Sequence, residues 1–232
     1  MPVAAMRPVE ELVDEKEPGW PVVAAMVDRA TNRVEVLPAE RSNGERTLLA
    51  IQITTRSPMG AIAYQTGGIL VDHGWVRLLG SGHPRLPRDL ARWNFPSGDP
   101  SLARLRGGFL VADDAIGGFF ALNGGAFEGP LRNVFYLAPD TLKWEDTRHD
   151  YTDLLDFFFR GDLQKFYSGQ RWPRWEEDVE KLSGDRGFSF YPFLFARAEG
   201  GIETRHRRDV PLDELWRLYV SDRTLDASGP AR

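Results

Sequence analysis

The chain of 232 residues contains no cysteine, so it can form neither a disulfide framework nor a cysteine-bound zinc site. Acidic residues outnumber basic residues by 34 to 29, and this balance provides no basic surface of the kind that nucleic acids require. The chain also lacks a run of the roughly 18 apolar residues needed to cross a membrane, and its start lacks the apolar core of a signal peptide. We therefore expect a cytoplasmic protein that contacts neither nucleic acid nor membrane.

The common sequence motifs of catalysis are absent as well. The chain has no P-loop, no dinucleotide-binding fingerprint and no Gly-x-Ser-x-Gly motif. The adjacent carboxylates Asp113 and Asp114 supply too few ligands for a hard cation, whereas aspartate is a common turn residue because its side chain caps nearby backbone amides. The sequence thus predicts no cofactor and no bound metal, and it identifies no catalytic residue.

The chain does contain short apolar runs that are separated by turn residues, including 23 glycines and 16 prolines. Three successive pairs of runs have the length and spacing of β-hairpins. They are residues 69–72 with 75–80, 109–112 with 118–122, and 133–137 with 141–144. This pattern predicts a mostly antiparallel sheet over about residues 69–144.

Helical patterns lie on both sides of the predicted sheet. Apolar residues recur at helical spacing in four segments, namely 21–30, 151–159, 172–182 and 211–220. Ser57 and Pro58 have the character of an N-cap and first turn, with Gly67 and Gly68 as the stop signal. We predict a single α+β domain over residues 1–222, with helices at both ends packed on the sheet, and a loose tail over 223–232.

Three further segments have weaker patterns. Residues 34–37 are typical of a short strand, and residues 45–53 suit either a helix or a strand. The aromatic run 188–195 indicates an edge or bulged strand because Pro192 interrupts it. The basic cluster 205–208 lies between two acidic residues, which favours a solvated charged loop over a binding patch.

The densest polar group surrounds the first hairpin. It comprises Asp72, His73, Arg77, His83 and Arg85. An aspartate that orients a histidine is half of a general-base pair. A turn is the stronger interpretation, because His73 precedes a glycine and neighbouring strand residues point to opposite faces.

The pairing around this turn suggests a second role for the hairpin. A two-residue loop places Val71 opposite Val76 and Leu70 opposite Arg77, so that one face is apolar. The other face carries Leu70, Asp72, Trp75 and Arg77. Since Trp and Arg are common at the centres of protein interfaces, Asp72, Trp75 and Arg77 are candidate partner-binding residues. A contact beneath the loop 95–100 is the competing interpretation.

Several longer segments resemble a bacterial family of proteins of unknown function, number 2625, over roughly residues 7–220. The segments that carry the resemblance are Thr55–Ile62, Gly67–Trp75, Gly80–Pro87, Val111–Gly125 and Phe190–Leu194. That family has no assigned activity, so the resemblance implies no reaction.

A second, weaker resemblance is to the SUKH superfamily of cell-wall regulators and immunity proteins. The segments that carry it are Gln65–Gly68, Ala112–Asp114 and Phe135–Asp140. The chain departs from that pattern in having Thr66 in place of asparagine and in being longer at both ends. The resemblance implies a non-enzymatic α+β module that binds another protein, and it supplies no catalytic residues.

The leading hypothesis is therefore a protein-binding module, in its specific form an immunity protein that occludes a toxin. The first alternative is a hydrolase-like enzyme with Asp72, His83 and the Asp113–Asp114 loop around a pocket, to which His73 and Arg85 are further candidates. The second alternative is a sensor of a small ligand. An enzyme needs these groups to converge on a pocket, whereas a binding module needs an exposed face with aromatic and charged anchors. The sequence defines neither the partner nor the oligomeric state.

Overall fold

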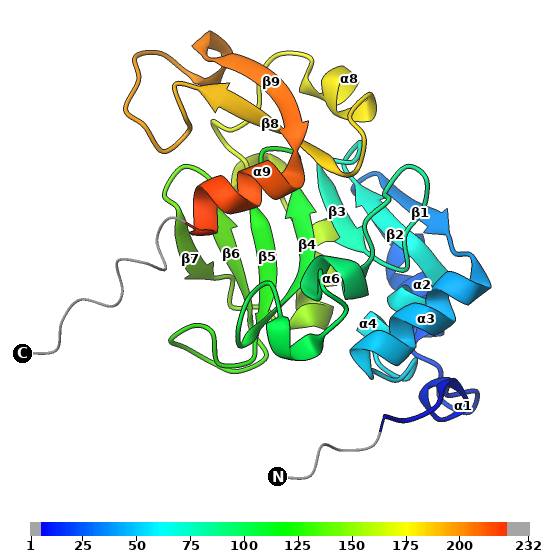
Figure 1. Cartoon of the computed structure of the whole chain (residues 1–232). Helices are drawn as coiled ribbons and strands as arrows, with labels where there is room; N and C mark the ends of the chain where they lie inside the picture. The colour runs from blue at the N-terminus through cyan, green and yellow to red at the C-terminus, as the bar shows by residue number, and fades with distance from the viewer. Residues whose placement is uncertain (1–5, 222–232) are drawn as a thin grey trace, which may run out of the picture.

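Seven strands pair in the order in which they occur along the chain, and each is antiparallel to the next. The computed structural model describes residues 6–221. In the view of Figure 1 the seven-stranded sheet lies below a separate two-stranded sheet. The strands of the large sheet are β1 (Val34–Pro38), β2 (Thr66–Val71), β3 (Val76–Leu79), β4 (Gly108–Asp114), β5 (Phe119–Asn123), β6 (Val134–Ala138) and β7 (Lys143–Asp146), and those of the small sheet are β8 (Arg186–Tyr191) and β9 (His206–Pro211). The predicted α+β fold with successive hairpins is confirmed.

Helices precede, interrupt and follow the large sheet. The α-helices are α1 (Val9–Leu12), α2 (Trp20–Asp28), α3 (Arg41–Ile51), α4 (Pro58–Gln65), α5 (Leu90–Asn94), α6 (Tyr151–Arg160), α7 (Leu163–Phe166), α8 (Trp175–Glu180) and α9 (Leu212–Trp216). Short 3₁₀ turns occupy η1 (Pro100–Leu102) and η2 (Ile202–Thr204), and a π-helical turn, η3 (Arg217–Ser221), follows α9. No helix within the described residues 6–221 has the length and apolar character needed to span a bilayer.

The register of the first hairpin agrees with the sequence prediction. Val71 pairs with Val76 and Leu70 pairs with Arg77. At the turn, Asp72 and His73 have φ of 51° and 62°, and the N–H of Gly74 donates to the Val71 carbonyl over 3.1 Å. Gly74 follows with φ of 88°, so three successive residues of the loop between Val71 and Val76 have positive φ. The turn therefore determines which side chains lie on each face of the sheet.

One helix end is at a different place from the predicted one. Ser57 caps α4, as predicted, by accepting a hydrogen bond of 3.1 Å from the N–H of Gly60. However, α4 ends at Gln65, and Gly67 and Gly68 belong to β2. A Cβ atom at Gly68 would lie 2.4 Å from the side chain of Leu86. These glycines permit close packing of the strand and are not a helix stop.

The structure also shows which elements form in the segments with weaker sequence patterns. Residues 45–53 fall largely within helix α3, and the predicted strand 34–37 is β1. The predicted helix 172–182 is limited to α8, because Arg174 adopts a left-handed conformation with φ of 63° directly before it. The basic cluster 205–208 is not a loop, since its last three residues begin β9. The expected tail 223–232 lies outside the described residues, and the domain boundary at 222 stays a prediction.

Helix α9 joins the two sheets. Leu212 and Leu215 are fully buried, and the Trp216 ring packs edge-on against Phe119 of β5 with 5.0 Å between ring centroids. On its other side α9 contacts β8 and β9, and Figure 1 shows it crossing between the two sheets. Its apolar residues therefore hold the small sheet on the large one.

We expect Trp216→Ala to lower the free energy of unfolding by about 3–5 kcal/mol, because it removes a large buried side chain from this junction. The control is Arg217→Ala, at an exposed position one residue later, for which a change within about 0.5 kcal/mol is expected. Chemical denaturation of both variants measures the difference. Equal stabilities would show that α9 does not hold the junction together.

Candidate functional site

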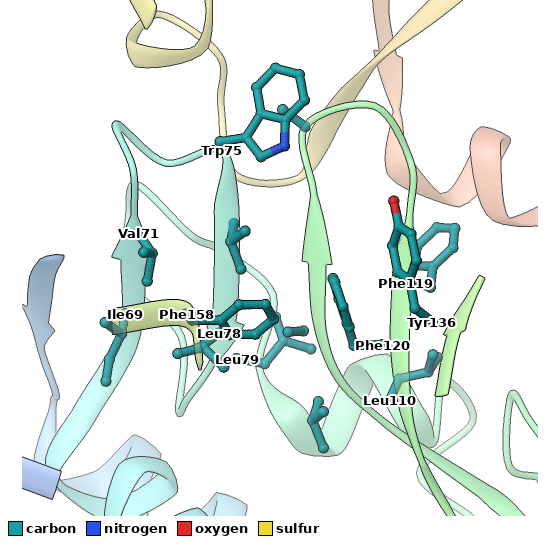
Figure 2. Close-up of a cluster of buried hydrophobic side chains, with 14 of the residues drawn as sticks. Ile69, Val71, Trp75, Leu78, Leu79, Leu110, Phe119, Phe120, Tyr136 and Phe158 are labelled. Atoms are coloured by element: carbon teal, nitrogen blue, oxygen red, sulfur yellow. The ribbon is translucent and has the colours of Figure 1, made fainter. Parts of the chain in front are cut away.

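The candidate partner-binding residues of the first hairpin are buried. Trp75 is 0% exposed and Arg77 is 2% exposed. The indole of Trp75 packs edge-on against Tyr167 and Trp175, with centroid distances of 5.4 and 5.0 Å. Figure 2 shows this indole at the end of β3, directed toward the chain above the sheet. The prediction that this face is an exposed interface is therefore wrong, because the segment around α7 and α8 folds back over it.

Asp72 holds that covering segment in place. Its carboxylate lies 2.5 Å from the guanidinium of Arg171, and both side chains are largely buried. The same guanidinium lies over the rings of Trp75 and Trp175, at 4.8 and 4.1 Å from their centroids. Stacking on aromatic rings suits the planar, weakly hydrated arginine side chain. Asp72 is thus part of an internal contact and not of a docking surface.

Asp113 is a fully buried carboxylate that lies between two arginines. Its Oδ1 is 2.7 Å from Nε of Arg77, as a charge contact, and its Oδ2 accepts a hydrogen bond of 2.5 Å from Arg88. Burial lowers the pKa of Arg88, and the charge of Asp113 opposes that effect. The arginines also donate to backbone carbonyls, Arg77 to Arg186 over 2.6 Å and Arg88 to Gly184 over 2.7 Å. The network therefore ties strands β3 and β4 to the chain that enters β8.

Asp114 caps the turn between β4 and β5. Its Oδ1 accepts hydrogen bonds from the N–H groups of Ile116 and Gly118, and its Oδ2 accepts one of 2.8 Å from the Tyr136 hydroxyl. Burial raises the pKa of Asp114 to about 6, although these hydrogen bonds act in the opposite direction. Within residues 6–221 no group of three or more His, Asp or Glu side chains is arranged to hold a metal ion.

His73 and Arg85 do share a surface hollow, of about 320 Å³, over the start of β1 and the first turn. Nδ1 of His73 and Nη1 of Arg33 both lie within 2.8 Å of Oε1 of Glu180, and Arg85 pairs with Glu35. These pairs are half-exposed and therefore worth about 0–1 kcal/mol each. The lining residues of this hollow include no hydroxyl nucleophile. An adjoining hollow of about 270 Å³, also lined by His73 and Arg85, includes Ser183, whose hydroxyl donates to Asp185 over 2.6 Å.

The residues of the hydrolase alternative do not converge. His83 lines a different hollow, beside Asp89 and Arg92, and its Nδ1 accepts the N–H of Arg85 over 3.2 Å. Asp72, Asp113 and Asp114 are each engaged by the separate partners described above. A general base and its orienting carboxylate must lie within hydrogen-bond reach of each other. This arrangement therefore provides no support for that alternative.

A solvent-facing site that the sequence did not identify lies on the small sheet. Along β8 and β9, alternate side chains point to opposite faces, and the cross-strand pairs are Ser189 with Arg208 and Tyr191 with His206. Together with Phe190, Phe193 and Arg207 these residues line a hollow of about 300 Å³. We call the surface that carries Ser189, Tyr191, His206 and Arg208 the hairpin face. Tyr191 is 73% exposed. A large aromatic side chain that remains this exposed beside an arginine is typical of an interface.

We expect Trp75→Ala to destabilise the protein by about 3–5 kcal/mol, since it empties the centre of the aromatic cluster. Tyr191→Ala is the comparison variant, and its free energy of unfolding should stay within about 0.5 kcal/mol of the unmodified protein. Thermal and urea unfolding measure both. If Trp75→Ala unfolds like the unmodified chain, the buried placement of this indole is wrong.

Asp114 gives a pH-dependent prediction. A folded-state pKa of about 6 is above the ordinary 3.8, so the folded protein binds this proton more tightly than the unfolded chain. This proton therefore stabilises the folded state fully below pH 4. As the pH rises through 6 that contribution to the free energy of unfolding, up to about 3 kcal/mol, is lost. Asp114→Asn should not show this loss. Between pH 4 and 7 its free energy of unfolding should therefore rise relative to that of the unmodified protein. A difference that is constant with pH would contradict the assignment.

Comparison with known proteins agrees with the first of the two resemblances. The profile of the family "Protein of unknown function DUF2625" matches residues 9–215. The uncharacterized protein YbfG of Escherichia coli (strain K12) is 43% identical over 92% of this chain and 95% of its own length. An uncharacterized protein of Haemophilus influenzae is 38% identical over 94% and 96% of the two chains. No solved structure matches, and these relatives do not support the SUKH resemblance. The chain belongs to the DUF2625 family of proteins of unknown function.

Proposed function

We propose that the protein is a protein-binding module and that its partner docks on the hairpin face. The observation that carries the proposal is the hollow of about 300 Å³ beside Tyr191, a residue that is 73% exposed. Tyrosine and arginine supply a large share of binding energy in protein interfaces, and a concave site allows the partner to bury them fully. The hairpin face and its hollow offer Tyr191, Phe193 and Arg208 in one place.

The loop at the tip of the hairpin is held in a defined conformation. One guanidinium nitrogen of Arg205 donates to the carbonyl of Pro192 over 3.0 Å and also to that of Phe193, and a second donates to Ala196 over 3.3 Å. The Phe193 ring stacks on Phe195 at 5.1 Å. A surface that is ordered before binding loses less conformational entropy when the partner docks.

The charge of the β8–β9 hairpin indicates what kind of partner would bind there. Residues 186–211 contain five arginines and three acidic residues, whereas the whole chain carries a net charge of −5. Arg208 is exposed and has only a loose contact of 3.5 Å with Glu214. A partner with an acidic surface would therefore find a complementary site here, and electrostatic attraction would favour encounter.

This proposal replaces Trp75 and Arg77 with the hairpin face as the partner contact, because both of those side chains are internal. It also favours a binding module over the hydrolase-like alternative, whose carboxylates are each occupied in internal networks. A toxin that an immunity-type module occludes is one partner class consistent with this role. A cytoplasmic location is part of the proposal.

The test uses a photo-crosslinking amino acid at position 191 in the native host, with position 131 as the control. Leu131 is 67% exposed but lies outside the hairpin. We expect a discrete protein adduct at position 191 and none at position 131. The affinity of the purified partner should then fall about 30-fold with Tyr191→Ala, the cost of a hot-spot residue, and stay unchanged with Leu131→Ala. Equal labelling at both positions, or an unchanged affinity for Tyr191→Ala, would overturn the proposal.

A further inference from the structure

The two strands of the small sheet have different outer edges. On the side of β8, the N–H of Phe188 donates to the carbonyl of Ala115 over 2.7 Å, so that this edge rests on the large sheet. On the side of β9, no further strand pairs within the part of the chain that the structure describes. The outer edge of β9 is therefore an unpartnered strand edge.

The hydrogen-bond alternation of an antiparallel pair shows which groups that edge presents. Because the N–H of Phe188 points to Ala115, its pair with Asp209 is of the non-hydrogen-bonded kind. The next pair but one, Phe190 with Arg207, is of the same kind. The N–H and C=O groups of Arg207 and Asp209 thus point away from β8.

Two of these four groups already have partners. The carbonyl of Asp209 accepts a hydrogen bond of 3.0 Å from the guanidinium of Arg186. For the N–H and C=O of Arg207, no partner is found among residues 6–221, and the N–H of Asp209 interacts with its own carboxylate. The open stretch is short, because Pro211 lacks an N–H and the N–H of Arg205 donates to Ile202.

The side chains that flank this edge select the segment that can add to it. His206 and Arg208 point to the hairpin face, and Arg207 lies on the opposite face against Trp172, 4.7 Å from the ring centroid. Two copies of β9 would bring basic side chains directly opposite one another, which is destabilising. The edge therefore disfavours self-pairing and favours a strand with carboxylates beside His206 and Arg208.

We propose that the edge of β9 binds an extended acidic segment of a partner protein as a third strand. Residues i and i+2 of that segment carry carboxylates that face His206 and Arg208, since alternate residues of a strand share one face. The backbone groups of Arg207 supply the hydrogen bonds, and the two basic side chains supply specificity. This inference rests on the proposed function and names the class of segment that the module recognises.

The experiment measures binding of a labelled, acetylated and amidated hexapeptide, Thr-Glu-Val-Glu-Val-Thr, to the full chain by fluorescence anisotropy. We expect saturable binding that falls at least 10-fold with Arg208→Glu and stays unchanged with Arg41→Glu, an exposed arginine on α3. The lysine analogue Thr-Lys-Val-Lys-Val-Thr should not bind. Absence of binding by the glutamate peptide, or equal affinity for the two charge-reversal variants, overturns the inference.

A second peptide series separates strand addition from simple charge attraction. Only alternate N–H groups of an added strand face β9, so N-methylation of successive residues should abolish binding at every second position. Equal effects at all positions would overturn strand addition. If position 191 crosslinks a partner while both peptide tests fail, the binding function stands and the edge inference falls. If the peptide binds but no partner is captured at position 191, the proposed function itself fails.

Discussion

The carboxylate of Asp113 is the group on which the arrangement of the two sheets depends. It is fully buried, and a lone charge in that position would be strongly unfavourable. Arg77 and Arg88 compensate it, but they are themselves buried and need further acceptors. The backbone carbonyls of Gly184 and Arg186 provide these. A charge placed near the end of β4 thus requires that the chain entering β8 lie against it.

The aromatic cluster around Trp75 supports the same junction from another side. Its rings come from the first hairpin and from the residues around α7 and α8, and Arg171 lies among them while pairing with Asp72. Trp172 then contacts Phe188 and Phe190 of β8 at 5.1 and 5.7 Å. The inner face of the small sheet is therefore fixed by packing, while Tyr191 on its other face is exposed.

Local patterns are sufficient to predict the three hairpins of the large sheet, because each is formed by neighbouring residues and a short turn. They do not predict the pairing of β1 with β2, because helices α3 and α4 separate these strands. The pairing of Val71 with Val76 follows directly from a turn at His73. The covering of that hairpin was not predictable in the same way. Asp72 and Arg171 are 99 residues apart, and Arg77 and Arg186 are 109 apart. The hydrophobic periodicity of neighbouring residues contains no information on contacts between segments this far apart in the sequence.

The hairpin face does not follow from the sequence for a related reason. Taken alone, the aromatic run 188–195 indicates an edge strand and the basic cluster 205–208 indicates a solvated loop. The register that pairs Tyr191 with His206 brings them onto one surface. A signal was available in the alternation of Ser189 and Tyr191 with two buried phenylalanines, but it required knowledge of the second strand.

The bridge from Arg77 to the carbonyl of Arg186 also has a consequence for the order of folding. The hairpins of the large sheet are local and can form while the chain is still being synthesised. Asp113 and its two arginines, however, obtain their last acceptors only from residues 184–186. The buried charges of the large sheet are therefore fully paired only after this C-terminal segment has been synthesised.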